Sequence, residues 1–354
     1  MTSARTPAIE TPLLVPVSGP FGSSDLARLR SPRAEPWADR FVLLDELVGA
    51  AERGRLYRRV ANGDLARVRA GVYLPSEFWS LLNDDLRFLA RIRAEALASP
   101  VPLLFGVQSA AALWGLPVVG DWPDRPTVLA ERAAGGRSAK SLERRCEGMP
   151  AEVWIIGGLA TTGLARTVVD VARDQRFGPA VAVADFALAR RPHVAGTTPL
   201  SVEKPELVRE LRGVDPLHGH ARVAAVVDFS DGDSGSVGES ISRVTAYRLG
   251  FPRPVLQFAF RDHLGEMFAD FWWPDYKLIG EFDGKGKYLR DEYTRGRSTA
   301  EVVLAEKARE DRLRALGAGV ARWGWAEATS TSGLRRTLLA AGLPMRPPRP
   351  SPPR

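Results

Sequence analysis

Cysteine and histidine are scarce in this 354-residue chain, which has one cysteine, Cys146, and four histidines. A single cysteine excludes an intramolecular disulfide bond and a zinc site made of several cysteines. The pair His218 and His220 has a spacing that could bind a metal, but the sequence shows no cluster of further ligands near it. We therefore interpret this pair as part of a polar loop.

Long apolar runs are also missing. No stretch approaches the roughly 20 apolar residues of a membrane-spanning helix, and residues 1–36 lack the basic start and apolar segment of a secretory signal. We therefore expect no membrane segment and a cytoplasmic location. Residues 1–37 are rich in Pro, Ser, Thr and Ala, and residues 336–354 are rich in Pro and Arg, so we predict disorder at both ends.

The length and the charge indicate several domains and an anionic partner. A chain of 354 residues is too long for one ordinary core, and its content of 45% hydrophobic and 26% charged residues is typical of a globular protein. The formal net charge is +7, and residues 237–354 contain 20 Lys and Arg against 14 Asp and Glu, whereas the remainder contains 29 against 28. A basic excess of this kind favours a polyanion such as nucleic acid.

Residues 38–80 have the pattern of a small DNA-binding unit. Apolar spacing predicts a helix near Phe41–Val48 and a second helix over Gly54–Asn62. Alternation then predicts a hairpin formed by Leu65–Arg69 and Val72–Leu74. Two helices followed by a short β-wing are the outline of a winged helix-turn-helix.

Six arginines lie between Arg53 and Arg69 of this unit, and five of them occupy shared faces. Three share a helix face because they are spaced i, i+3 and i+4, and two alternate along a strand; they are Arg55, Arg58, Arg59, Arg67 and Arg69. Such a face is either simply solvated or follows DNA phosphates. Because the charges coincide with the second helix and the wing, we predict that they bind DNA.

A middle domain of mainly helical α/β type is predicted over residues 85–195. Helices are expected over residues 105–117 and 164–172. The second helix carries Arg166 and Asp170 at i, i+4, which is compatible with a functional site but is more typical of an ion pair on a helix surface. We predict the surface pair.

Residues 196–236 are predicted to be a linker with one short helix, and the last domain covers residues 237–330. Its periodicity predicts the order helix, three strands, helix, strand. The elements of this αβββαβ arrangement are expected at Glu239–Leu249, Val255–Arg261, Met267–Trp273, Lys277–Asp283, Ala300–Leu316 and Gly319–Trp323. The chain is thus expected to be a multidomain α/β protein.

Acidic residues occur in this last domain where fold stability alone would favour apolar ones. Asp270 lies in the strand sequence MFADFWW, on one face with Phe268 and Trp272, and an unpaired buried carboxylate is destabilising. In the next strand Glu281 and Asp283 share a face and repel one another. A cation bound between the two strands would relieve both effects.

These side chains indicate a divalent metal. Mg²⁺ and Mn²⁺ prefer hard oxygen ligands, often a few carboxylates with water and phosphate, and a metal held this way activates water for phosphodiester hydrolysis. The predicted ligands are Asp270, Glu281 and Asp283, with Glu239 as a further oxygen donor and Lys285, Lys287 or Lys307 as a positive charge near the phosphate.

At these residues the chain resembles the PD-(D/E)XK nuclease superfamily, and most of all the branch related to very-short-patch-repair endonucleases. The matching segments are GESISR (Gly238–Arg243), GFPRPVLQ (Gly250–Gln257), ADFWWPDYKLIGEFDGKGKY (Ala269–Tyr288) and AEKAREDRLRALGAGVARWGW (Ala305–Trp325). The resemblance implies a restriction-endonuclease-like fold, a helix acid at Glu239, and metal-binding acids at Asp270 and Glu281.

The chain departs from the family pattern at two positions. Superfamily members commonly have Lys two residues after the second acid, where this chain has Asp283. The related branch usually has His three residues after the following Gly, where this chain has Lys287. Both departures concern the catalytic step more than metal binding.

The N-terminal part resembles the antitoxin of abortive-infection type IV toxin–antitoxin systems. The matching segments are GRLYRRVANGDLARVRAGVYL (Gly54–Leu74), SAAALWGLP (Ser109–Pro117) and TTGLARTVVDVA (Thr161–Ala172). The resemblance covers roughly residues 41–190. It implies a DNA-binding winged helix, a second domain for partner or DNA contact, and a cognate toxin as a partner.

Two functions fit these patterns. The first is a Mg²⁺- or Mn²⁺-dependent endonuclease that acts on double-stranded DNA, with RNA left open as a substrate. The second is a non-catalytic, antitoxin-like autorepressor whose nuclease fold serves only to bind DNA. We favour the first, and both hypotheses predict a nucleic-acid partner.

Overall fold

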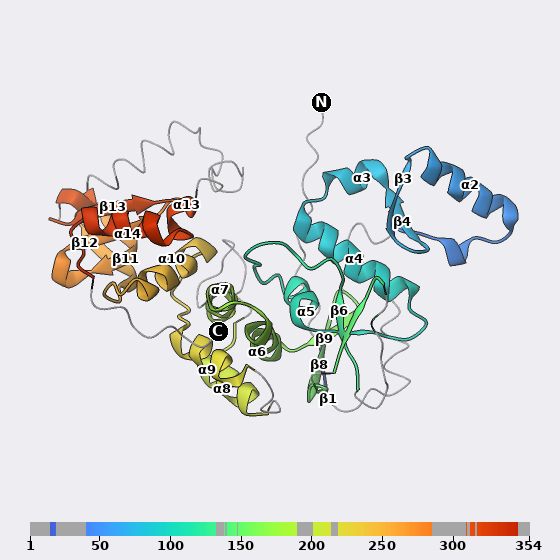
Figure 1. Ribbon diagram of the computed structural model, residues 1–354, viewed down its shortest axis with the longest axis horizontal. Coiled ribbons are helices and arrows are strands. Elements are labelled where there is room, and N and C mark those ends of the chain that lie inside the picture. The colour runs from blue at the N-terminus through green and yellow to red at the C-terminus, as the bar shows by residue number, and fades with distance from the viewer. Residues whose placement is uncertain are drawn as a thin grey trace. The chain divides into compact units, whose positions relative to one another are not determined.

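The computed structural model describes residues 15–18, 40–131, 138, 140–146, 148–189, 201–213, 219–284, 309, 312–315 and 317–345. These residues form three β-sheets with accompanying helices (Figure 1). The chain divides into two compact units, the first Met1–Val171 with Glu206–His218 and the second Ala172–Pro205 with Gly219–Arg354. The predicted multidomain α/β class is confirmed at this level. None of the described helices is long and apolar enough to cross a membrane.

The first unit begins with a three-stranded antiparallel sheet of order β2-β4-β3. Its strands are β2 (Val42–Leu43), β3 (Leu65–Arg69) and β4 (Val72–Pro75). Helix α2 (Ala50–Ala61) buries Leu56 against Leu65 and Tyr73 of the hairpin. Helices α3 (Ser76–Leu81) and α4 (Asp84–Ala98) follow, and Figure 1 shows the β3–β4 hairpin beside α2.

The predicted helix at Phe41–Val48 is wrong, whereas the second helix and the hairpin are confirmed. Residues 42–43 form strand β2, and Leu44–Glu46 form a single 3₁₀ turn, η2. Val42 pairs with Tyr73 and Leu43 with Val72. A short apolar run suits either a helix or a buried strand, and here the strand is selected because β4 supplies the hydrogen-bonding partner.

A six-stranded sheet forms the rest of the first unit, in the order β1-β8-β9-β5-β6-β7. Its strands are β1 (Val15–Ser18), β5 (Leu104–Phe105), β6 (Thr127–Leu129), β7 (Glu143–Arg145), β8 (Glu152–Ile156) and β9 (Leu159–Thr162). Helix α5 (Val107–Leu113) is buried throughout, and Phe88 and Ile92 of α4 pack with Phe105 and Val128. The middle region therefore has more β-structure than the mainly helical domain that was predicted.

Strand β1 also corrects the prediction that residues 1–37 are disordered. Val15–Ser18 pairs antiparallel with β8, from Val15 opposite Ile155 to Ser18 opposite Glu152. The pairing satisfies backbone groups that composition alone would leave to solvent. The other residues of 1–37 lie outside the described residues.

The division between the units also differs from the predicted domain boundaries. Helix α6 (Leu164–Asp174) contains the boundary at residues 171–172, and α7 (Phe177–Leu188) belongs to the second unit, where it packs against α10 (Val237–Arg248). A middle domain that ends at residue 195 and a C-terminal domain that begins at residue 237 are thus not the observed division.

The predicted linker, residues 196–236, contains two helices among its described residues. The expected one is α9 (His220–Phe229), which buries Val223 and Val226. The other, α8 (Lys204–Gly213), was missed although Leu207 and Leu211 are spaced i, i+4 and are both buried.

The second unit is organised around a four-stranded sheet of order β10-β11-β12-β13. Its strands are β10 (Val255–Asp262), β11 (Gly265–Trp273), β12 (Leu278–Phe282) and β13 (Gly319–Trp323). The first three are antiparallel neighbours, and β12 pairs parallel with β13. Residues 312–315 are helical between β12 and β13, so the described elements follow the predicted αβββαβ order.

Each face of this sheet carries its own apolar cluster. The face we call the α10 face includes Phe271, Trp273, Leu278 and Trp323, which pack with α10, α13 (Trp325–Ala328) and α14 (Thr331–Ala340); Figure 1 shows these helices beside the strands. The face we call the Leu313 face includes Met267, Ala269, Ile279 and Leu313.

Helix α14 corrects the predicted disordered tail at residues 336–354. Leu338 of α14 and Leu343 beyond it are buried in the α10-face cluster. Their burial stabilises residues up to about 343 as part of the fold. Residues 346–354 lie outside the described residues.

Candidate carboxylate site and basic surface

The first turn of α10 comes very close to the end of β12. The side chain of Ser236 caps this helix by accepting a hydrogen bond from the backbone N–H of Glu239, at 3.2 Å. The residue before Glu239, Gly238, has no room for a side chain, because a Cβ there would lie 2.0 Å from the ring of Phe282. The sequence Ser-Val-Gly-Glu therefore brings the helix acid close to the end of strand β12.

The structure brings Glu239 and Asp270 together through Gln257. The Gln257 amide nitrogen donates to Oε2 of Glu239 at 3.1 Å and to Oδ1 of Asp270 at 3.3 Å. The loop before α10 supplies two further donors to Glu239, which are the backbone N–H of Gly235 at 2.7 Å and the hydroxyl of Ser236 at 2.8 Å. Glu239 is buried, with 3% of its surface exposed.

Asp270 also occupies the point where the β11–β12 ladder opens. The last ladder pair toward this end is Phe271 with Gly280. Beyond it the backbone N–H of Phe282 donates to Oδ2 of Asp270 at 2.9 Å. The carboxylate thus replaces a backbone acceptor for β12, and Glu281 is the residue of β12 that directly precedes the donor Phe282.

Glu281 is buried and has arginine partners. Its Oε2 accepts a hydrogen bond from Arg309, which also donates to the carbonyl of Phe268 at 2.9 Å. Arg322, opposite Glu281 in the parallel β12–β13 pair, lies 4.0 Å from the same carboxylate oxygen. The negative charge of Glu281 is therefore compensated within the protein.

Asp283 follows β12 at the same end of the sheet. Its backbone N–H donates to the carbonyl of Trp323 at 2.8 Å. Its Oδ1 is enclosed and has no hydrogen-bond partner within the described part of the chain. A buried carboxylate oxygen without a donor suits a cation or a water.

Three lysines were also predicted to lie at the site. Lys285, Lys287 and Lys307 lie outside the described residues. Among the residues that are described, no group of three or more His, Cys, Asp or Glu side chains has the arrangement of a metal site. The acids that share a hydrogen-bond donor are Glu239 and Asp270, which both accept from the Gln257 amide. One or two carboxylates with waters and phosphate are the usual ligands of Mg²⁺ in proteins.

The strand alternation assumed for Asp270 is broken at that residue. Ala269 packs in the Leu313 face, but Phe271, two residues later, packs in the α10 face. Phe268 is 38% exposed, whereas Trp272 packs against the Leu313 face. The prediction that Phe268, Asp270 and Trp272 line one face is therefore wrong, because the strand changes phase at Asp270.

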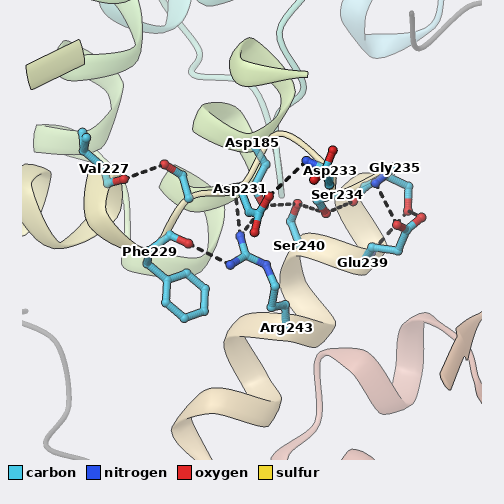
Figure 2. Close-up of polar contacts among 12 residues, drawn as sticks. Asp185, Val227, Phe229, Asp231, Asp233, Ser234, Gly235, Glu239, Ser240 and Arg243 are labelled. Atoms are coloured by element: carbon cyan, nitrogen blue, oxygen red, sulfur yellow. Dashed lines mark hydrogen bonds and ion pairs between the residues drawn. The ribbon is translucent and has the colours of Figure 1, made fainter. Parts of the chain in front are cut away.

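A buried ion pair anchors the helix that carries Glu239. Arg243 of α10 donates to both carboxylate oxygens of Asp185 in α7, at 2.9 and 2.8 Å, and Ser240 donates to Asp185 at 2.7 Å (Figure 2). The backbone N–H of Asp231 adds a donor at 2.7 Å. Burial raises the pKa of the Asp185 carboxyl above its ordinary value, while the charge of Arg243 and these hydrogen bonds oppose that shift.

The ion pair is linked to Glu239 through the preceding loop. The hydroxyls of Ser234 and Ser240 lie 2.9 Å apart, and Figure 2 shows Ser234 between Asp185 and Glu239. The carboxylate of Asp185 thus holds the loop at Asp231, and the carboxylate of Glu239 holds it at Gly235. This arrangement makes the position of Glu239 depend on α7.

Sequence reasoning assigned no site role to four residues that the structure brings to these acids: Asp185, Gln257, Arg309 and Arg322. Gln257 had a visible signal, because it is a polar residue inside the apolar strand VLQFAF. Arg309 lies 28 residues from Glu281 in the sequence, and Asp185 lies 58 residues from Arg243. Arg322 is brought to Glu281 by the pairing of β12 with β13.

On the first unit, four of the five predicted DNA-binding arginines are exposed: Arg55, Arg58, Arg59 and Arg67. The fifth, Arg69, forms an ion pair with Glu95 of α4, with 3.1 Å between Nη1 and Oε2. The β3–β4 register shifts between Arg67 and Arg69, so the two are not equivalent positions on one strand face. Burial raises the pKa of the Glu95 carboxyl.

The Arg166–Asp170 pair corrects another prediction. It was expected on a helix surface, but Arg166 is 6% exposed and Asp170 is fully buried. The Arg166 Nε lies 2.9 Å from both oxygens of Asp170, and its Nη2 donates to the carbonyl of Gly148 at 3.1 Å. These contacts make the pair part of the packing of α6.

Comparisons with protein-family models, with curated proteins and with solved structures found no match for this chain.

Proposed function

We propose that the second unit is a nuclease-like module that hydrolyses phosphodiester bonds of DNA with a divalent metal, within a restriction-endonuclease-like fold. The observation that carries this proposal is the meeting of Glu239 and Asp270, from α10 and β11, on one amide nitrogen of Gln257. Glu281 lies on β12 immediately before Phe282, whose backbone N–H donates to Asp270. Acids from three neighbouring elements of one sheet and its helix offer the oxygen atoms that a hard cation prefers.

Asp270 and Glu281 would hold the metal, with Glu239 and Asp283 as the remaining oxygen donors. Bound Mg²⁺ or Mn²⁺ supplies water activation and neutralises charge on the leaving oxygen. Arg309 and Arg322 hold the Glu281 carboxylate in place, and their charge favours an anionic phosphate nearby.

The first unit would supply DNA affinity. Arg55, Arg58 and Arg59 are exposed on α2, and Arg67 is exposed on the adjoining strand β3. Their spacing lets them contact successive phosphates of a duplex, in the manner of a winged helix. We assign Arg69 to the fold instead, because it is held by Glu95.

The decisive experiment incubates the purified full-length protein with supercoiled plasmid and Mg²⁺ or Mn²⁺, beside the Asp270→Asn protein. Nicking by the wild type, with a loss of at least about a hundredfold in the variant, is expected for removal of a metal ligand. DNA affinity should stay within a factor of about two, since the arginine surface is unchanged. Equal nicking by both proteins would rule out the assignment.

A second candidate function is that of a non-catalytic regulator, an antitoxin-like autorepressor with a cognate toxin as partner. The observation that favours it is the compensation of the acids by the protein itself, through Arg309 on Glu281 and the Gln257 amide between Glu239 and Asp270. A site of this kind keeps its fold without a metal.

Metal titration separates the two candidates. The regulator should bind its own promoter DNA with the same affinity in EDTA and in Mg²⁺, and should leave plasmid intact. The nuclease should require the metal for cleavage. Metal-dependent nicking that disappears in Asp270→Asn would show that the protein is not a purely non-catalytic regulator.

A further inference from the structure

Gln257 lies where two paired strands change phase together. On β10, Leu256 packs against the α10 face, whereas Phe258, two residues later, contacts Trp272 of the Leu313 face. On β11 the same change occurs between Ala269 and Phe271. Alternate residues of a regular strand share a face, so both strands rotate at one point.

The pairing register is kept through this rotation. Leu256 pairs with Phe271 and Phe258 with Ala269, so neither strand gains a residue as in a β-bulge. Instead, the backbone of Gln257 is left-handed, with φ of +44°. Residues other than glycine rarely adopt this conformation, which persists only where the surroundings hold it.

The Gln257 side chain meets a specific need at this point. Two carboxylates that approach each other repel, and an amide NH₂ has two hydrogens with which to serve two acceptors. The amide nitrogen is within hydrogen-bonding distance of both Glu239 and Asp270. Gly235 leaves space for the arrangement, because a Cβ there would lie 3.1 Å from the amide nitrogen.

We propose that Gln257 is a positioning residue of the candidate site: its amide holds Glu239 and Asp270 at a shared point, and its left-handed backbone rotates β10 so that the amide reaches them. Glycine would suit this backbone better. The side chain therefore serves the two acids at the expense of the strand. Its role in the reaction rests on the proposed function, whereas its hold on the carboxylates does not.

The first test needs no metal. Gln257→Ala removes the amide, and two double-mutant cycles combine it with Glu239→Gln and with Asp270→Asn, each protein being unfolded by urea in EDTA. If the amide couples to both acids, the shifts in unfolding midpoint will be non-additive in both cycles. Additive shifts in both would overturn the proposal.

Gln257→Gly separates the backbone from the side chain. Glycine accepts positive φ, so this variant should fold and should unfold at the same or a higher temperature than Gln257→Ala. Lys277→Gly is the matched control, because Lys277 has φ of +46° in the same unit and is exposed. A lower unfolding temperature for Gln257→Gly than for Gln257→Ala would contradict the strain argument.

Calorimetric titration with Mn²⁺ alone then measures whether Gln257 contributes to metal affinity at the candidate site. Loss of an outer partner of a metal ligand typically lowers metal affinity about 10- to 100-fold, and this loss is expected for Gln257→Gly and Gln257→Ala but not for Lys277→Gly. Unchanged affinity in the Gln257 variants would overturn the positioning role. If the wild type binds no Mn²⁺ while the cycles are non-additive, Gln257 still holds the acids and the metal-dependent function falls.

Discussion

The basic surface of α2 and the carboxylate site of the β10–β13 sheet concentrate charge in opposite ways. The arginines of α2 are exposed, and a helical repeat alone places them together. The acids of the second unit come from separate elements and are held by donors distant in sequence. The first arrangement offers charge to a partner with little effect on folding, whereas the second couples its charges to the stability of the fold.

The largest loss of stability is expected from a change at the buried Asp185–Arg243 pair, which tests whether buried charges are coupled to the fold. Asp185→Asn leaves the Arg243 guanidinium buried without its counter-charge, which should lower the free energy of unfolding by about 3–5 kcal/mol. Urea denaturation monitored by tryptophan fluorescence measures this change in the free energy of unfolding. Asp275→Asn, at an exposed position in the same unit, should change it by less than about 0.5 kcal/mol. A loss below about 1 kcal/mol at Asp185 would show that the pair contributes little.

The next effect concerns the close approach of α10 to β12. Gly238→Ala should lower the free energy of unfolding by about 1–3 kcal/mol because the new methyl group meets the ring of Phe282. The same variant should weaken the proposed plasmid nicking, since it displaces Glu239. Gly213→Ala in α8 is the control, as nothing lies within 4 Å of its Cβ position. Equal stability of the two variants would mean that the contact relaxes freely.

A third prediction separates the arginines of the first unit. Arg69→Ala leaves the buried Glu95 carboxylate without its ion-pair partner and should reduce the free energy of unfolding by about 1–3 kcal/mol. Alanine at the exposed Arg58 or Arg59 should change it by less than about 0.5 kcal/mol. Thermal denaturation of the three variants provides the comparison.

DNA affinity should depend on Arg58 and Arg59 and not on Arg69, which is the reverse of the expected effects on stability. Loss of Arg58 or Arg59 should reduce the slope of log affinity against log salt by about 0.9 for each phosphate contact removed. Arg69→Ala should leave that slope unchanged while the protein is folded. A smaller slope for Arg69→Ala alone would assign the DNA contact to the strand instead of the helix.

The smallest effect is expected at a partly buried ion pair of the second unit, Asp262 with Arg312. The hydrogen bond from Arg312 lowers the pKa of the Asp262 carboxyl from 3.8 to about 2, and Arg312 Nε lies 2.8 Å from its Oδ2. Because the folded-state pKa is the lower one, the pair stabilises the fold above the ordinary pKa, and this stabilisation is lost as the pH falls toward about 2. Unfolding temperatures measured between pH 5 and pH 2 should fall less steeply for Asp262→Asn than for the wild type. Parallel curves would indicate that Asp262 is not coupled to folding.

Local patterns predicted much of the second unit. The alternation of apolar residues located β10, β11, β12 and β13, and the helix expected at Glu239–Leu249 corresponds to α10, which begins two residues earlier at Val237. The same patterns identified Glu239, Asp270 and Glu281 as unusual acids. They did so because hydrophobic periodicity depends on residues a few positions apart.

The sequence by itself thus determined the order of these elements, the exposed arginine face of α2 and the acids of β11 and β12. Only the tertiary structure decided that residues 42–43 pair as a strand, that Arg69 belongs to Glu95, and that Gln257 and Arg309 serve the acids. Hydrogen bonds and ion pairs of this kind join groups far apart in the chain. Their partners are selected by packing, which no local periodicity encodes.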